Sequence, residues 1–154
     1  MDSLLPTILK KVWDELGSGY KEHIYQKAIE VEFQNEHIIF HSEVICPVNY
    51  HGVQIGFERA DIVTYKDGVP SSILELKSQI NSVNKKEFIQ ISKYFTSLNV
   101  NEGYVINFII TPDMFLQQET NKYRYIELFK ISLIDNIKIL KYSFNNDVYK
   151  EYKI

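Results

Sequence analysis

The sequence has one cysteine and no excess of positive charge. The single Cys46 excludes an internal disulfide, fits a reducing compartment and is expected to be a small buried apolar side chain. A net charge of −3 and an isoelectric point near 5.8 exclude a global basic surface, so any nucleic-acid contact must come from a local patch or bound cations. No run of about 18 apolar residues and no cleavable signal pattern occurs, which predicts a soluble, intracellular (cytoplasmic or nuclear) protein without membrane contact.

The composition predicts one folded domain over residues 1–154. Hydrophobic residues make up 45% of the chain and charged residues 24%, as in ordinary globular proteins. Helical spacing of apolar residues predicts helices over 3–16, 20–36 and 84–98. Period-two or continuous apolar runs predict strands over 39–48, 53–65, 71–78, 103–110, 123–134 and 137–144.

The order of these elements indicates the fold class. It is α-α-β-β-β-α-β-β-β, which predicts an α/β domain (α+β-like in order) with helices packed on the sheet. The first three strands are expected to form an antiparallel meander, and residues 111–122 a loop or short helix.

The acidic residues of two neighbouring strands carry the clearest chemical signal. Asp61 lies in one apolar strand, and Glu75 and Lys77 lie in the next, after a turn that contains Gly68 and Pro70. Alternation along a strand puts Glu75 and Lys77 on the same face, so that the two acids can meet with the lysine beside them. Two carboxylates that converge repel each other and favour a bound cation.

A purely structural interpretation competes with this one. Glu and Lys alternate on many solvated strand faces, and Arg59 could pair with Asp61. The strongly apolar strands favour the functional interpretation, because a buried acid is costly without a partner.

The helix that follows presents Gln90 and Tyr94 on one face. Asn84 and Glu87 form a capping-box pattern at its start. Lys86 and Lys93 either extend the functional face or belong to the solvent side of the helix.

Three motifs together resemble the PD-(D/E)XK nuclease superfamily. Asp61 followed by Glu-Leu-Lys at 75–77 resembles its defining motif, and Gln-x-x-x-Tyr at 90–94 resembles the helix motif of its RecB-like branch. Gly-x-x-Glu-x-x-Tyr at 19–25 is similar to the motif of the GxxExxY family. Two positions depart from the pattern: Ala60 replaces the nominal Pro, and Glu-Phe-Ile at 87–89 replaces the His-Glu-Ala of relatives. The resemblance implies a restriction-endonuclease-like mixed sheet, with a core of about 5–110 and a β-rich C-terminal extension of about 112–154.

The resemblance also implies a metal site. Asp61, Glu75 and the carbonyl of Leu76 would hold Mg²⁺ or Mn²⁺ with the help of Glu22. Glu22 has a second possible role, because an acid at the third helical position, after a cap at Gly19, stabilises a helix start.

The implied activity is hydrolysis of phosphodiester bonds by a metal-activated water. Lys77 would orient that water and offset charge at phosphorus, while Gln90 and Tyr94 would steady the site or contact the substrate. The lysines expected to bind nucleic acid are Lys85, Lys86 and Lys93. DNA is the expected substrate, with RNA as the alternative.

Two non-enzymatic functions stay open. The fold can serve as a catalytically inactive module that binds nucleic acid or protein, which the acidic isoelectric point favours. The C-terminal strands can also pair with a second copy or another protein.

Overall fold

The structure, a computed structural model, describes residues 1–111 and 122–153. The elements are α1 (Leu4–Leu16), α2 (Glu22–Asn35), β1 (Ile39–Tyr50), β2 (Val53–Lys66), β3 (Val69–Lys77), α3 (Lys85–Leu98), β4 (Glu102–Phe108), the 3₁₀ helix η2 (Lys122–Tyr125), β5 (Ile126–Ser132), β6 (Lys138–Ser143) and β7 (Val148–Glu151). No helix in the described ranges is long and apolar enough to cross a membrane. Most of the expected loop, residues 112–121, lies outside the described residues.

The strands of the described residues form one seven-stranded sheet in which they lie in chain order. Within this described sheet only β3 and β4 pair in parallel, and every other pair of neighbours is antiparallel. A parallel pair needs a long crossover connection, and α3 provides it. The mixed sheet flanked by helices and the antiparallel meander of β1 to β3 confirm the predicted fold class.

The end of the chain differs from the sequence prediction. A seventh strand, β7, pairs with β6, and η2 occupies the start of the expected strand 123–134. With only four residues, β7 is too short to show a clear alternation. It forms because the turn at Asp147, which has a positive φ of 53°, returns the chain along the open edge of β6.

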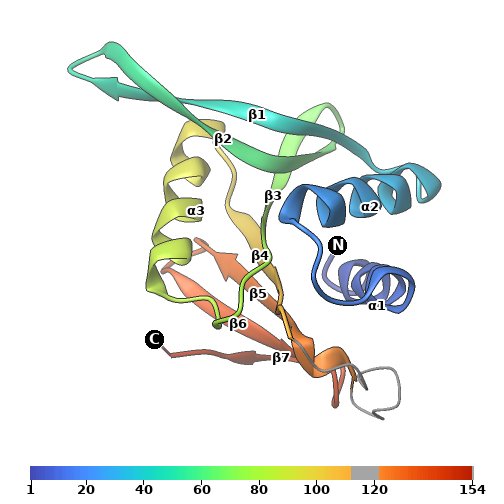
Figure 1. The fold of residues 1–154 in the computed structure, drawn as a ribbon. Coiled ribbons are helices and arrows are strands. Elements are labelled where there is room, and N and C mark those ends of the chain that lie inside the picture. Colours follow the sequence, from blue (N-terminus) through green and yellow to red (C-terminus); the bar gives the residue numbers. More distant parts are fainter. Residues whose placement is uncertain (112–121, 154) are drawn as a thin grey trace.

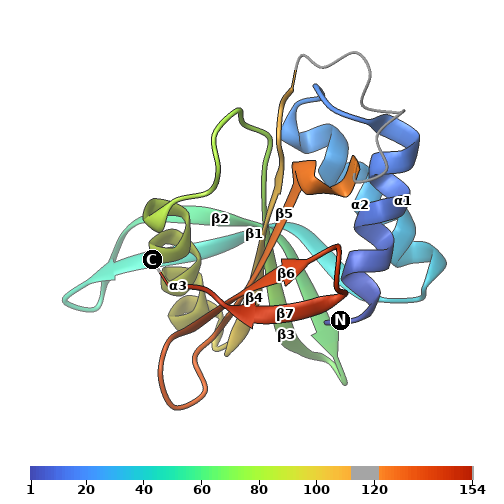
Figure 2. The ribbon, with the colours of Figure 1, turned by 90° about the horizontal axis from the view of Figure 1, so that it is seen from below.

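Helices cover both faces of the sheet, α1 and α2 on one side and α3 on the other (Figures 1 and 2). Leu74 and Leu76 of β3 pack in the layer under α1 and α2, whereas Ile73 packs under α3. The predicted capping box of Asn84 and Glu87 starts α3. These layers place β3 between both helix groups, so its side chains reach either face.

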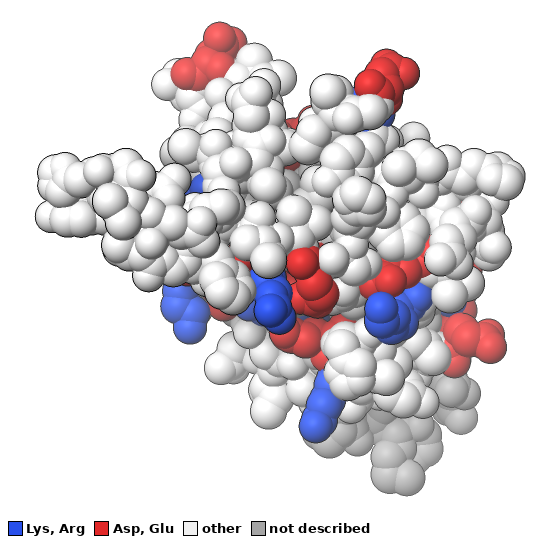
Figure 3. All heavy atoms as spheres, turned by 90° about the horizontal axis from the view of Figure 1, so that it is seen from above, with Lys and Arg blue, Asp and Glu red and all other residues white. Residues whose placement is uncertain are grey.

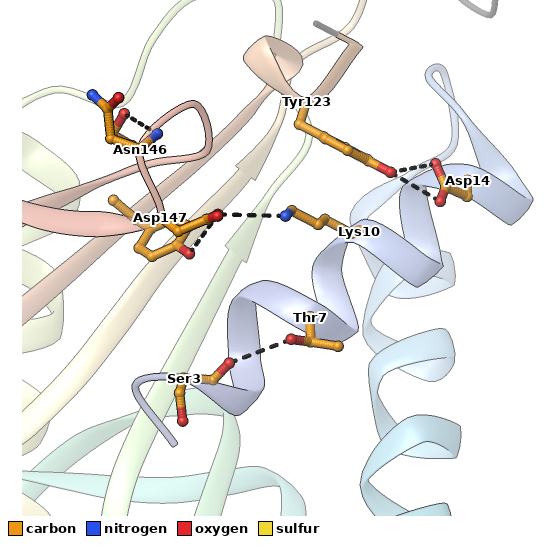
Figure 4. A network of polar contacts seen from close by, with 9 residues as sticks. Ser3, Thr7, Lys10, Asp14, Tyr123, Asn146 and Asp147 are labelled. Carbon is orange, nitrogen blue, oxygen red and sulfur yellow. Dashed lines mark hydrogen bonds and ion pairs between the residues drawn. The ribbon is translucent and has the colours of Figure 1, made fainter. Parts of the chain in front are cut away.

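Polar contacts connect the C-terminal strands to α1 (Figure 4). Lys10 Nζ lies 3.5 Å from Asp147 Oδ1, which also accepts a hydrogen bond from the Tyr142 hydroxyl at 3.1 Å. The Tyr123 hydroxyl lies 3.0 and 3.1 Å from the two carboxylate oxygens of Asp14. Exposed contacts of this kind contribute at most about 1 kcal/mol each, so they orient the strands more than they stabilise them.

Candidate active site

Asp61 and Glu75 meet where β2 and β3 separate. The backbone pairing of β2 with β3 ends at Ile62↔Leu74. Beyond this pair, side-chain carboxylates accept the backbone hydrogen bonds between the two strands. The Asp61 N–H donates to Glu75 Oε1 at 3.0 Å, and the Leu76 N–H donates to Asp61 Oδ2 at 2.7 Å. Each carboxylate thus accepts a backbone hydrogen bond from the opposite strand. This exchange orients both side chains and brings the two acids together.

Burial and mutual repulsion make this pair hard to ionise. Burial, followed by the negative charges of Glu22 and Glu43, raises the pKa of Asp61 to about 6, although one backbone N–H and one lysine oppose the change. Burial and then the charge of Asp61 raise the pKa of Glu75 well above its ordinary range. Within the described residues, neither carboxylate has a cation within 4.0 Å. The pair therefore favours a bound cation.

Lys77 and Glu22 act on the charge of the pair from two different elements. Lys77 follows Glu75 by two residues on β3, and its positive charge lowers the pKa of both Asp61 and Glu75. Glu22 is exposed at the start of α2, and its charge raises both pKa values. The charges of Glu22 and Lys77 thus reach both acids, but Glu22, Asp61 and Glu75 do not form a cluster of three metal-binding side chains within the described residues.

The start of α2 corrects the predicted position of Glu22. Gly19 is not the helix cap; Lys21 is, with an extended backbone and no capping side-chain hydrogen bond. Gly17 and Gly19 have positive φ values of 67° and 103°, which keep the chain out of the helix until Lys21. Glu22 is consequently the first helical residue instead of the third. An acid there still interacts favourably with the helix dipole.

Gln90 and Tyr94 form a hydrogen-bonded pair on α3. Gln90 Nε2 donates to the Tyr94 hydroxyl at 3.0 Å, which leaves the hydroxyl hydrogen available for a second acceptor. Burial and then the charge of Glu75 raise the pKa of Tyr94, so Tyr94 lies on the Glu75 side of the sheet. Tyr94 and Lys93 line a hollow of about 550 Å³ between α3 and the β1–β2 hairpin.

The three candidate lysines do not gather at one place. Lys93 borders the hollow beside Tyr94. Lys85 and Lys86 lie exposed in the first turn of α3, and Lys86 borders a different hollow next to the 79–84 loop. Figure 3 shows acidic and basic side chains next to each other in a band across one face. The positive charge at this site is therefore local, as the acidic isoelectric point suggests.

A comparison with known families gives the site its context. The family model described as the PD-(D/E)XK nuclease superfamily matches residues 2–119. The chain belongs to this superfamily. Comparisons with curated proteins and with solved structures found no match. The matched residues include α1 to β4, and hence every site residue described above.

PD-(D/E)XK nucleases generally use divalent metal ions. The carboxylates of Asp61 and Glu75 and the carbonyl of Leu76 are hard oxygen donors, the type that Mg²⁺ and Mn²⁺ prefer. Among the described residues, however, no three His, Cys, Asp or Glu side chains form a metal-binding cluster. The groups that would hold such an ion are therefore the two carboxylates and the Leu76 carbonyl, which are of the chemical type that it prefers.

Sequence reasoning missed Gln26, which supports Asp61 from α2. Gln26 is buried, and its Nε2 lies 3.1 Å from Glu30 Oε2, 3.2 Å from Glu43 Oε1 and 3.3 Å from the Asp61 carbonyl oxygen. The two hydrogens of this amide are shared among three acceptors, so Gln26 connects α2 with β1 and β2. The only available signal was the i,i+4 spacing of Gln26 and Glu30, which is common on helices.

Two further missed residues hold the loop that follows Lys77. Asn107 and Glu127 are buried, and Asn107 Nδ2 donates to Glu127 Oε1 at 2.9 Å. Their oxygens accept the backbone N–H groups of Gln79 at 3.2 Å and Val83 at 3.0 Å. The PD-(D/E)XK site is therefore supported directly after its lysine. Asn107 was missed because it lies within an apolar run, and such a run predicts a buried strand but no polar role for one of its residues.

Proposed function

We propose that the protein is a divalent-metal-dependent nuclease that hydrolyses phosphodiester bonds of DNA, with RNA as the alternative substrate. The observation that carries the proposal is the Asp61–Glu75 pair, in which Glu75 is buried and Asp61 is half-buried. Among the described residues neither carboxylate has an ion pair within 4.0 Å, and Lys77 follows Glu75 by two residues on β3. A buried acidic pair destabilises a fold unless a cation offsets its charge. A protein without metal chemistry would have little reason to hold one.

The proposed roles follow from the positions of the side chains. Asp61, Glu75 and the Leu76 carbonyl would hold Mg²⁺ or Mn²⁺, with Glu22 next to them. The ion supplies a more acidic bound water and offsets phosphate charge. Lys77 orients the water and stabilises the negative charge that develops when the new P–O bond forms and the bond to the leaving sugar oxygen breaks.

The hollow beside Tyr94 is the proposed path of the substrate. Tyr94 is buried and accepts a hydrogen bond from Gln90, so its proposed role is to steady the site from the wall of this hollow, while the half-buried Gln90 can contact the substrate. Lys93 supplies positive charge beside this hollow, whereas Lys85 and Lys86 would bind the nucleic-acid backbone separately, at the start of α3. None of these contacts involves a base edge, so the proposed binding follows the backbone.

Finer assignments rest on the sequence motifs. The Gly-x-x-Glu-x-x-Tyr motif at 19–25 supports membership of the GxxExxY family, and Gln90 with Tyr94 supports the RecB-like branch. Buried Tyr25 stacks on Phe108 with ring centroids 4.1 Å apart, which supports a packing role. We also propose a single domain over 1–154, with a core of about 5–110 and an extension of about 112–154 that can contact a partner.

A cleavage assay tests the proposal. Labelled single- and double-stranded DNA and RNA are incubated with Mg²⁺, Mn²⁺ or EDTA. We expect metal-dependent cleavage that Lys77→Ala abolishes and that Lys66→Ala, which removes an exposed lysine at the far end of β2, leaves intact. No cleavage together with no Mn²⁺ binding by calorimetry would refute the nuclease.

The rival is an inactive module that binds nucleic acid or protein. The net charge of −3 and the lack of a three-side-chain metal cluster in the described residues favour it. Its signature would be metal-free binding to DNA or RNA that Asp61→Ala leaves undiminished.

A further inference from the structure

The β1–β2 hairpin has an uncharged end, residues 45–57, here called the arm. These thirteen residues contain no Asp, Glu, Lys or Arg. The arm projects beyond the rest of the molecule in Figure 1, and the same projection is uncharged in Figure 3. Proteins usually protect a projecting edge strand with charged side chains, so an uncharged one indicates a contact surface.

The apolar side chains of the arm are unusually exposed. Five of them outside the hollow have exposed fractions between 52% and 65%: Ile45, Tyr50, Val53, Ile55 and Phe57. With about 200 Å² of surface for each side chain, these five present on the order of 500 to 600 Å² of apolar area. This reaches the upper end of the largest apolar patch of a typical monomer, about 300 to 600 Å².

The strand register separates the two sides of the arm. Cys46 and Glu58 are paired and line the hollow next to α3, so they mark the side of the proposed substrate path. The neighbours of this pair, Ile45 and Phe57, point to the opposite side. The outer side of the arm therefore stays accessible when the hollow is filled.

We propose that the arm is the contact surface of a two-fold symmetric dimer of this chain. In a two-fold dimer the same patch meets itself, and an uncharged apolar ribbon with polar residues at its tip satisfies this requirement without charge repulsion. Two arms together supply about 1,000 to 1,200 Å², which reaches the lower end of the size range of specific interfaces. A nucleic acid would instead require cations on the arm.

This location differs from the contact expected at the C-terminal strands. The strand at that edge, β7, has only four residues, whereas β1 at the opposite edge has twelve. The larger exposed apolar area lies on β1 and β2, and the arm is therefore the stronger candidate.

Sedimentation equilibrium over a range of about 1 to 200 µM tests the dimer with the full chain. We expect the wild-type mass to approach twice 18.2 kDa as the concentration rises. Val53→Glu/Ile55→Glu places charge on the arm and is expected to raise the dimer dissociation constant at least about 100-fold. The matched control, Val69→Glu/Ile137→Glu, changes an equally exposed Val and Ile elsewhere and is expected to leave it unchanged.

A second variant keeps the test independent of folding defects. Val53→Thr/Ile55→Thr removes apolar area but retains β-branched side chains that suit a strand, and it should also weaken the dimer. A wild-type chain that stays at 18.2 kDa throughout, or a dimer that both arm variants leave intact, would overturn the proposal. A monomer whose metal-free binding to single-stranded DNA depends on the arm would equally overturn it and assign the arm to base stacking.

Discussion

Replacing Asp61 with Asn should stabilise the metal-free protein at neutral pH. Asn keeps an oxygen that can accept the Leu76 N–H and removes a charge that burial, Glu22 and Glu43 all oppose. On folding, the pKa of Asp61 rises from 3.8 to about 6. Each pH unit of such a change is worth about 1.4 kcal/mol, so ionised Asp61 costs the metal-free fold up to about 3 kcal/mol.

The sign of the pH dependence follows from the same change in pKa. The folded state binds the proton more tightly, so the wild-type protein keeps its stability below pH 3.8 and loses it as the pH rises to about 6. The increase in the free energy of unfolding caused by Asp61→Asn should thus be small near pH 4, grow up to about pH 6 and stay constant above it.

Urea unfolding in EDTA at several pH values measures this gain. Glu151→Gln, which neutralises an exposed acid on β7, is the control and should change stability by less than about 0.5 kcal/mol. Mg²⁺ or Mn²⁺ should reverse the ranking, because an ion stabilises the wild-type protein and not the variant. An Asn variant that is less stable than wild type above pH 6 in EDTA would refute the reasoning.

Two further predictions concern Gln26, which supports Asp61, and Gly103, where α3 packs on β4. Gln26→Ala removes the donor of two acceptors, on Glu30 and at the Asp61 carbonyl, and should lower the free energy of unfolding by about 1 to 3 kcal/mol. The control Gln34→Ala changes an exposed residue of the same helix and should have little effect. Equal effects of the two substitutions would contradict the supporting role of Gln26. At Gly103 an added Cβ would lie 2.8 Å from a backbone oxygen, so Gly103→Ala should lower the free energy of unfolding, measured by thermal unfolding, by about 2 kcal/mol or more. The control Gly56→Ala has open space around it and should be neutral or slightly stabilising. A neutral Gly103→Ala would contradict the packing of α3 on β4.

Local patterns were sufficient for most of the elements. The apolar stripes of the helices, the capping box at Asn84 and the continuous apolar run of β4 depend on neighbours in sequence, and each element formed where its pattern predicted. The patterns failed where local signals are weak. The four residues of β7 and the start of α2 at Glu22 depend on a neighbouring strand edge and on the backbone of Gly17 and Gly19.

The sequence by itself determined the fold class and the PD-(D/E)XK superfamily. It also selected residues that could meet, because strand alternation places Glu75 and Lys77 on one face. Only the tertiary structure decided how they meet. The crosswise hydrogen bonds of Asp61 and Glu75 and the amide of Gln26 beneath them join residues 14 to 35 positions apart. Burial and repulsion at that point set the pKa of each acid, and these depend on distances in space, which no local sequence pattern contains.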